Sequence, residues 1–258
     1  MSIGRRGLLA SAGLLLGGAA PPPPLAATPI SRLALPWWRR RHAAKLRELR
    51  SRRVDLVFLG DSITQNWERS GPPDWQDFQP AWRHYYGGRD AVNLGFTGDA
   101  TCHLLWRLRN GEASGIAPRA AVILIGANNL GRLHWPADDD VAGIVAVVEE
   151  TRHRLARVRV LLLGVLPSER SAWASETTVA INRALAERYP AGGEVAFFDP
   201  APLFAPGGRI ERSLFYDPLL TPPQPPLHPT AAAQARLAAA IEPTLAALLG
   251  ERPRPPLT

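Results

Sequence analysis

A chain of 258 residues can build one well-buried core and is too short to hold two full catalytic domains. Its formal charge of +7 falls to +5 (28 basic against 23 acidic residues) when residues 1–27 are set aside, and an excess of this size does not by itself indicate a nucleic-acid-binding protein. The single cysteine, Cys102, excludes an internal disulfide and a cysteine-rich metal cluster, and we expect it to be a small buried residue.

The first 27 residues have the pattern of an export signal. Arg5 and Arg6 precede an apolar run from Gly7 to Ala20, and prolines and small residues follow as far as Ala27. The run is shorter than the roughly 20 residues of a membrane-spanning helix. The paired arginines resemble a twin-arginine signal, with an ordinary secretory signal or an uncleaved anchor as alternatives. We therefore expect a bacterial periplasmic or secreted protein, cleaved near Ala27 and not stably inserted in the membrane afterwards.

Residues 28–53 predict an N-terminal segment and a helix, the helix spanning 37–53. Trp38, Leu46 and Leu49 are the candidates for its buried side. Its basic residues predict a solvated helix face, with a site for a polyanion or a membrane surface as the alternative. These residues are Arg39, Arg40, Arg41, Lys45, Arg47, Arg50, Arg52 and Arg53.

Short apolar runs then alternate with longer helical stretches across a main domain of residues 54–250. The expected strands are 54–59, 91–94, 120–125, 158–163 and 195–198, and the expected helices are 101–109, 138–157, 175–188 and 230–249. Continuous apolar strands are typical of a parallel sheet that is covered on both faces. The sequence therefore predicts an α/β protein, a three-layer α/β/α sandwich around a central parallel sheet of about five strands. Residues 251–258 are expected to form a disordered tail.

Six prolines lie between Pro218 and Pro229, just before the last expected helix. Neither a helix nor a central strand accommodates them, so this segment predicts a stiff, extended loop. Because parallel-sheet proteins bind ligands at the carboxyl ends of their strands, the loop could border a site. A surface spacer is the alternative interpretation.

Four short polar segments fall where strands are expected to end. Gly60-Asp61-Ser62 offers a hydroxyl at a tight turn before a helix, and Gly98 can present a bare backbone N–H. Asn128 follows an apolar strand with a side-chain amide that can donate, and His228 places an imidazole before the last helix. Each segment alone is a common turn or surface feature. Together they supply the nucleophile, donors and base that an acyl-transfer site requires.

With these residues in place, the chain resembles the SGNH hydrolases, also called GDSL esterases and lipases, in the branch similar to platelet-activating-factor acetylhydrolase. The resemblance covers nearly the whole mature chain and implies a flavodoxin-like SGNH hydrolase fold and carboxylic ester hydrolase activity. It rests on FLGDSITQNW (58–67), NLGFTGDATCHLLWRLRNGE (93–112), LIGANNLG (124–131), LLLGVLPS (161–168), the pair Ile181-Asn182 and LHPT (227–230). We expect no cofactor and no metal ion, because His103 and His134 have no second ligand at the spacing of a metal site.

The resemblance also implies a role for each matching residue. Ser62 is the nucleophile, and its own N–H is the first donor of the oxyanion hole. The N–H of Gly98 is the second donor and the side-chain amide of Asn128 the third. His228 is the general base that takes the Ser62 proton and returns it to the leaving alcohol. Asp61 is expected to fix the turn rather than to join the chemistry.

The sequence departs from the family at the third member of the triad. The family has an aspartate three residues before the histidine, where this chain has Pro225. Joining Asp217-Pro218 directly to 227–230 would spell an uninterrupted DPLHPT motif, so we interpret residues 219–226 as an eight-residue insertion. The favoured hypothesis is that Asp217 still reaches His228 as the third catalytic residue, and a Ser-His dyad is the alternative.

These residues predict a serine esterase that acts on small acyl esters, above all acetyl esters. The export signal favours an acetylated glycan as the partner substrate. A lysophospholipase or other lipid-ester hydrolase, and a catalytically impaired binding or scaffold protein, are the alternatives. Five tryptophans could stack on sugars, although packing is the favoured interpretation: Trp67, Trp75, Trp82, Trp106 and Trp135. No nucleic-acid partner is expected, and the oligomeric state and the choice between hydrolysis and acyl transfer stay open.

Overall fold

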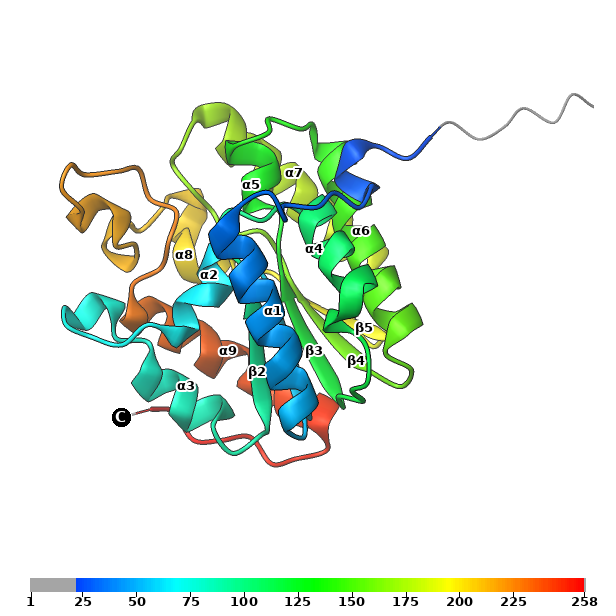
Figure 1. The fold of residues 1–258 in the computed structure, drawn as a ribbon. Coiled ribbons are helices and arrows are strands. Elements are labelled where there is room, and N and C mark those ends of the chain that lie inside the picture. The colour runs from blue at the N-terminus through cyan, green and yellow to red at the C-terminus, as the bar shows by residue number, and fades with distance from the viewer. Residues whose placement is uncertain (1–21, 258) are drawn as a thin grey trace, which may run out of the picture.

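Within residues 22–257, which the computed structural model describes, five short apolar runs form one parallel sheet (Figure 1). The strands are β1 (Leu56–Gly60), β2 (Ala91–Gly95), β3 (Ala120–Leu124), β4 (Arg159–Leu163) and β5 (Val195–Phe198). Their order across the sheet is β2-β1-β3-β4-β5. The predicted α/β class is therefore confirmed, and every strand begins and ends within two residues of its expected range.

The two faces of the sheet are covered by different helices, which gives the expected three-layer sandwich (Figure 1). Val57 and Leu59 of β1 pack in a core shared with α1, α4, α6 and α7. Leu56 and Phe58 point the other way, into a second core shared with α3 and α9. The helices are α1 (Pro36–Ser51), α2 (Ser62–Gln65), α3 (Gln79–Tyr86), α4 (Thr101–Arg107), α5 (Ala127–Gly131), α6 (Ala137–Arg154), α7 (Ala172–Arg188), α8 (Ala201–Phe204) and α9 (Ala231–Leu249).

The register of the sheet brings three strand ends to one level. Gly60, the last residue of β1, pairs with Gly95 of β2 on one side and with Leu124 of β3 on the other. The strand order changes direction at β1, and open α/β sheets bind ligands at the carboxyl ends beside such a point. The segments that follow these three strands therefore lie side by side at the position where a ligand is expected.

Two glycines let the first turn after β1 lie directly against the sheet. A Cβ atom at Gly60 would lie 2.1 Å from Oγ1 of Thr64, and one at Gly95 would lie 2.2 Å from the backbone nitrogen of Gln65. Real Cβ atoms do not approach that closely, because the atoms would overlap. Both glycines are thus needed for α2 to pack where it does.

The long helices match their expected ranges to within three residues, and the cap residues explain the shifts. Ser171 accepts a hydrogen bond from the N–H of Ala174, so α7 begins at Ala172, before the expected start at residue 175. Thr230 caps α9 in the same way. On α1, Trp38 and Leu49 are buried as expected, whereas Leu46 is only half-buried.

The basic face of α1 is not wholly solvated. Lys45 is buried in ion pairs with Glu48 and Glu68, and Arg41 also pairs with Glu68. The other basic side chains of the run are exposed: Arg39, Arg40, Arg47, Arg50, Arg52 and Arg53. The expected solvated face therefore covers only part of the basic run.

The C-terminal segment differs from the expected disordered tail. Residues 251–257 lie against α3 and α9, because their backbone groups find partners there. The N–H of Arg254 donates to Glu242, and the N–H of Leu257 donates to the hydroxyl of Tyr85. These contacts hold residues 251–257 on the surface, where disorder was expected.

Residues 1–21, which hold most of the expected export signal, lie outside the described residues. Leu25–Ala27 form a short 3₁₀ turn, η1, packed against α4 and α6. Ala26 is fully buried, and its carbonyl accepts a hydrogen bond from Oγ1 of Thr101. Cleavage near Ala27 would remove this buried residue from the folded protein. Across residues 22–257, no helix combines the length and the apolar character that a membrane span needs.

Candidate active site

The turn after β1 is fixed by the side chain of Asp61. Its Oδ1 accepts the N–H of Ile63 at 2.9 Å, which caps the short helix α2 that begins with Ser62. Asp61 is buried, and burial raises the pKa of its carboxyl to about 6. The capping contact agrees with the expected role of Asp61 in shaping the turn, and it places Ser62 at the first position of the helix.

Three side chains from distant parts of the chain form a continuous line of hydrogen bonds. Oγ of Ser62 lies 2.9 Å from Nε2 of His228, and Nδ1 of His228 lies 2.6 Å from Oδ1 of Asp217. This is the arrangement of a nucleophile, a base and an acid that orients the base. The structure thus brings together Ser62, His228 and Asp217, the three residues that the sequence nominated.

The proline-rich insertion leaves this line undisturbed. The chain departs after Asp217 in a 3₁₀ turn, η7 (Asp217–Leu219), and returns at Leu227. The two ends are joined by a hydrogen bond from the N–H of Tyr216 to the carbonyl of His228. Between the ends, residues 221–225 are exposed. The insertion therefore forms a surface loop, and its ends lie side by side.

Asp217 is held as a carboxylate. Burial acts to raise the pKa of Asp217, but hydrogen bonds from the His228 ring and from the backbone N–H groups of Leu227 and His228 outweigh it and lower the pKa. An ionised Asp217 fixes the tautomer of His228 with a proton on Nδ1, because a carboxylate only accepts. The other ring nitrogen, Nε2, is then free to accept the proton of Ser62.

Tyr216 is a site residue that the sequence did not reveal. Its ring stacks on His228, with 5.3 Å between the ring centroids and 11° between the planes. Its hydroxyl accepts hydrogen bonds from Asn66 and Arg69, and Trp75 stacks on the same ring. The sequence offered one indication of its role, which is that Tyr216 directly precedes Asp217. The ring limits the rotation of His228.

The expected oxyanion residues lie on the other two strand ends. Gly98 has a φ of +75°, a left-handed conformation that favours glycine. Nδ2 of Asn128 donates to the carbonyl of Asp99 at 3.0 Å and lies 3.4 Å from Oδ2 of Asp61. The amide of Asn128 therefore bridges the turn of Ser62 and the loop of Gly98, the two other expected sources of donors.

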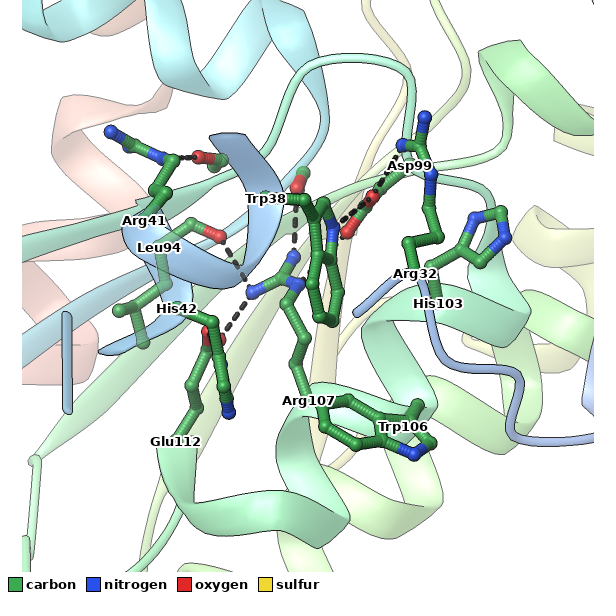
Figure 2. Close-up of polar contacts among 12 residues, drawn as sticks. Arg32, Trp38, Arg41, His42, Leu94, Asp99, His103, Trp106, Arg107 and Glu112 are labelled. Atoms are coloured by element: carbon green, nitrogen blue, oxygen red, sulfur yellow. Dashed lines mark hydrogen bonds and ion pairs between the residues drawn. The ribbon is translucent and has the colours of Figure 1, made fainter. Parts of the chain in front are cut away.

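A buried ionic cluster lies beneath these loops (Figure 2). Arg107 of α4, fully buried, donates to Oδ2 of Asp99 at 2.9 Å and also pairs with Glu112. It donates further to the carbonyls of Gly60 and Leu94, each at 3.1 Å. One guanidinium thus joins the ends of β1 and β2 to the loop that carries Gly98.

The N-terminal segment completes this cluster. Arg32 donates to Oδ1 of Asp99 at 2.9 Å, and the indole N–H of Trp38 donates to the same oxygen at 2.8 Å (Figure 2). His42 contacts Glu112. Sequence reasoning gave Arg107 no role, although an arginine between leucines 104, 105 and 108 was the available signal.

Three of the five candidate tryptophans pack rather than line the site. Trp67 is buried, and Trp82 and Trp106 contact other aromatic rings in or beside the core. Nδ1 of His103 accepts the N–H of Ala100. Cys102 is buried and unpaired. In the part of the chain that the structure describes, no three His, Cys, Asp or Glu side chains lie together as a metal site requires.

Known proteins show similarity to both the sequence and the fold. The platelet-activating factor acetylhydrolase IB subunit alpha1 of Homo sapiens is 33% identical over 130 residues, which are 50% of this chain and 51% of that protein. The alpha2 subunit of Rattus norvegicus is 32% identical over 131 residues, 50% of this chain and 52% of that protein. The chain thus spans about half the length of the curated relatives it matches.

Solved structures share the fold over most of the chain. A GDSL-like lipase from Bacteroides thetaiotaomicron has a TM-score of 0.59 at 18% identity and covers 80% of this chain and 96% of its own. A carbohydrate esterase of family 3 from Talaromyces cellulolyticus has a TM-score of 0.53 at 18% identity, and the match covers 76% of this chain and 98% of the esterase. The model of the GDSL-like Lipase/Acylhydrolase family matches residues 58–236, which reach from β1 into α9. The chain therefore belongs to the GDSL-like lipase/acylhydrolase family.

Proposed function

We propose that this acylhydrolase is a serine esterase that cleaves small acyl esters, and acetyl esters in particular, with Ser62, His228 and Asp217 as its catalytic residues. The observation that carries the proposal is the unbroken line of hydrogen bonds from Ser62 through His228 to Asp217. A protein that only binds esters has no need for a base at 2.9 Å from a serine hydroxyl.

The geometry supports a two-step reaction. Nε2 of His228 accepts the hydroxyl proton as Oγ of Ser62 attacks the acyl carbon. Asp217 stabilises the imidazolium that forms. His228 then gives the proton to the leaving alcohol, and the acyl group stays on Ser62. In the second step His228 takes a proton from water, which attacks the acyl carbon of the acyl-enzyme. His228 then returns this proton to Oγ of Ser62 as the bond to the acyl group breaks and the acid leaves.

Negative charge on the carbonyl oxygen is stabilised by backbone and side-chain donors. The N–H groups of Ser62 and Gly98 and the amide of Asn128 are the proposed donors. Nδ2 of Asn128 donates one hydrogen to the carbonyl of Asp99 at 3.0 Å in the free protein, which orients the amide before substrate arrives. Its second hydrogen, whose contact with Oδ2 of Asp61 is longer at 3.4 Å, is the one proposed to move to the oxyanion. A fixed donor costs little reorganisation when the oxyanion forms.

The acetyl group and the sugar part of the substrate are supported by related proteins. The curated relatives are named for an acetylhydrolase, and the structural neighbours include a carbohydrate esterase and an acetyl esterase. The export proposed below would add a place where acetylated glycans are abundant. We therefore assign an acetylated carbohydrate as the substrate class, ahead of a lysophospholipid or another lipid ester.

A panel of esters tests this function. The wild-type protein and Ser62→Ala are compared on p-nitrophenyl acetate, butyrate and octanoate and on acetylated xylan. We expect the wild type to hydrolyse the acetate ester fastest and to release acetic acid from xylan. In Ser62→Ala the rate of hydrolysis should fall about 10³-fold or more. Activity on octanoate alone would favour a lipid-ester hydrolase. Absence of Ser62-dependent labelling by a fluorophosphonate would contradict the catalytic assignment altogether.

We also propose that residues 1–21 direct export to the periplasm or the exterior. The paired arginines, Arg5 and Arg6, support the twin-arginine route. Cell fractionation of the wild type and of the variant with both arginines changed to lysine tests the route. Export of both proteins alike would favour an ordinary secretory signal, and retention of both in the cytoplasm would contradict export.

A further inference from the structure

A cleft of about 400 Å³ opens beside the loop that carries Gly98. It connects with the site through two residues. Gln65 belongs to α2, the short helix that begins with Ser62, and its Oε1 accepts the N–H of Thr97 at 2.7 Å. The cleft is lined by Arg32, Leu35, Trp37, Gln65, Thr97 and Arg132. Its position next to a proposed oxyanion donor makes it a place for part of the substrate other than the reacting carbonyl.

Two guanidinium groups lie directly over the glycine. A Cβ atom at Gly98 would lie 2.8 Å from Nη1 of Arg132 and 3.4 Å from Nη1 of Arg32. Arg132 directly follows α5, the helix that carries Asn128. Two arginines of the cleft lining thus lie over Gly98, one of the proposed oxyanion donors.

Arg32 and Arg107 are paired with acids, whereas Arg132, in the described part of the chain, is not. Oδ1 of Asp99 is shared by Arg32 and Trp38, and Oδ2 is held by Arg107 (Figure 2). Within residues 22–257, the structure gives Arg132 no carboxylate partner and no hydrogen-bond acceptor for its side chain. The five N–H donors of its guanidinium are therefore available to a ligand.

His103 shows the effect of this charge on a neighbouring group. Burial, and then the positive charges of Arg32, Arg107 and Arg132, lower the pKa of His103 to about 4. The imidazole is therefore neutral at neutral pH and does not add to the charge. Asp99 and Glu112 are both paired with Arg107, and a third buried acid, Asp61, lies 3.4 Å from Nδ2 of Asn128. Among the described residues, none of these three carboxylates pairs with Arg132.

The rest of the cleft suits the carbon skeleton of a small ester. Trp37 is 37% exposed and Leu35 38% exposed, and the guanidinium of Arg32 lies 5.6 Å from the centre of the Trp37 ring. An apolar wall beside unpaired donors is typical of a site that binds an organic anion. Arginine binds carboxylate and phosphate groups alike, through two parallel hydrogen bonds.

We propose that Arg132, with Arg32, binds a carboxylate or phosphate group carried by the substrate a few bonds from its ester, so that the preferred substrates are anionic esters. This inference rests on the proposed esterase function and names the chemistry of its substrate. An acidic sugar that bears an acetyl group has the required carboxylate, and an acetylated phosphate monoester has the required phosphate. A cationic ester would be disfavoured by the same two arginines.

A series of aryl acetates that differ in one substituent tests the proposal. The substrates are 3-acetoxybenzamide (neutral), 3-acetoxybenzoate, 3-acetoxyphenyl phosphate and the trimethylammonium analogue. For the wild type we expect kcat/KM to be at least tenfold higher for one or both anions than for the amide, and lowest for the cation. The better anion shows whether the cleft is built for a carboxylate or a phosphate. Added salt should reduce the preference, because it screens the charges.

Two variants locate the preference. Arg132→Gln is expected to lower the anion-to-amide ratio of kcat/KM at least tenfold, mostly through KM. Arg157→Gln removes the same charge from the loop before β4, at the amino ends of the strands and therefore at the opposite end of the sheet from the cleft, and should leave the ratio unchanged. The proposal would be overturned if Arg132→Gln lowered kcat/KM equally for all four esters, or if the wild type preferred the amide or the cation.

A binding measurement separates this proposal from the esterase function. Calorimetry with Ser62→Ala compares 3-acetoxybenzoate with 3-acetoxybenzamide when no turnover occurs. Tighter binding of the benzoate by Ser62→Ala, absent from the double variant that also carries Arg132→Gln, would support anion binding in the cleft even if no ester is hydrolysed. Equal binding of the two compounds by a protein that hydrolyses acetate esters would overturn the anion site and leave the esterase function standing.

Discussion

Asp217 and His228 stand eleven residues apart in the sequence, yet Oδ1 of the aspartate lies 2.6 Å from Nδ1 of the histidine. The second oxygen, Oδ2, accepts the N–H groups of Leu227 and His228. The carboxylate therefore holds both the ring of His228 and the backbone that carries it. These contacts involve only the two ends of the proline-rich loop.

The change Asp217→Asn tests whether the aspartate orients the base. The new side chain would present either its oxygen or its NH₂ group to Nδ1 of His228, and the favourable charge for the imidazolium would be gone. We expect kcat on p-nitrophenyl acetate to fall about 10³- to 10⁴-fold with little change in KM. Asp74→Asn, at an exposed position, is the control. A loss below tenfold would mean that Ser62 and His228 act as a dyad.

Removing residues 219–226 tests whether the loop is an insertion. The deletion joins Asp217-Pro218 to Leu227-His228 and restores a three-residue spacing. Because the Asp217 contacts lie at the ends of the loop, we expect kcat within about tenfold of the wild type. Circular dichroism and a melting curve establish that the shortened protein is folded. A folded but inactive protein would show that the loop itself positions His228.

The sequence predicted the strand ends and failed to predict what lies beneath them. Apolar runs and the turns that follow them are local patterns, so Ser62, Gly98, Asn128 and His228 could be placed at one edge of a sheet. Asp217 could be nominated only because residues 219–226 interrupt an otherwise continuous DPLHPT motif. These signals need no knowledge of packing.

The contacts that sequence analysis missed depend on tertiary structure. Arg107 contacts residues of two strands and a loop, and nothing in its own helix shows which carbonyls it will meet. Tyr216 stacks on a histidine that is distant along the loop. Helix α3 is short and rich in aromatic residues, so it lacks the long apolar period by which a helix is recognised.

The pH dependence of stability should carry the signature of Asp61. Its pKa is about 6 in the folded protein and near 3.8 when the chain is unfolded. Between those values the folded state binds more protons, so the stability contributed by protonated Asp61 is full at low pH and is lost as the pH rises to about 6. The change is on the order of 3 kcal/mol, since one pKa unit corresponds to about 1.4 kcal/mol.

Melting curves of the wild type and Asp61→Asn between about pH 4 and pH 8 check this expectation. The asparagine does not titrate, so its melting temperature should rise relative to the wild type as the pH increases, and the difference should level off above about pH 6. A difference that stays constant over the whole range would show that the carboxyl has its ordinary pKa.

Ala26 predicts where export processing can occur. A protein that begins at Thr28 lacks the buried Ala26 and the acceptor of the Thr101 hydroxyl, whereas one that begins at Pro22 keeps both. A buried donor without a partner costs about 1–3 kcal/mol. We expect the shorter protein to unfold at lower urea concentration by about that free energy, and N-terminal sequencing to find mature protein that starts at or before Leu25. Equal stability of the two proteins would be inconsistent with a structural role for η1.

Arg107 should be the most sensitive charged residue outside the proposed triad. Changing it to Gln leaves the buried carboxylates of Asp99 and Glu112 without their shared partner, and breaking a buried ion pair costs about 3–5 kcal/mol. Arg109, two residues later, pairs with Glu150 on the surface, where its side chain is 46% exposed. The same change there should cost less than about 1 kcal/mol, because water screens the pair.

Urea unfolding and ester hydrolysis measured together separate stability from positioning. The Gly60 and Leu94 carbonyls, at the ends of β1 and β2, lose their donor in Arg107→Gln, so the turn of Ser62 and the loop of Gly98 should shift relative to each other. We therefore expect kcat to fall in the protein that is still folded, with KM less affected. Arg107→Lys keeps the charge but cannot reach all four partners of the guanidinium. Its kcat should therefore lie between those of the wild type and Arg107→Gln. If Arg107→Gln lost no more stability than Arg109→Gln and kept its kcat, the buried cluster would have no part in holding the site.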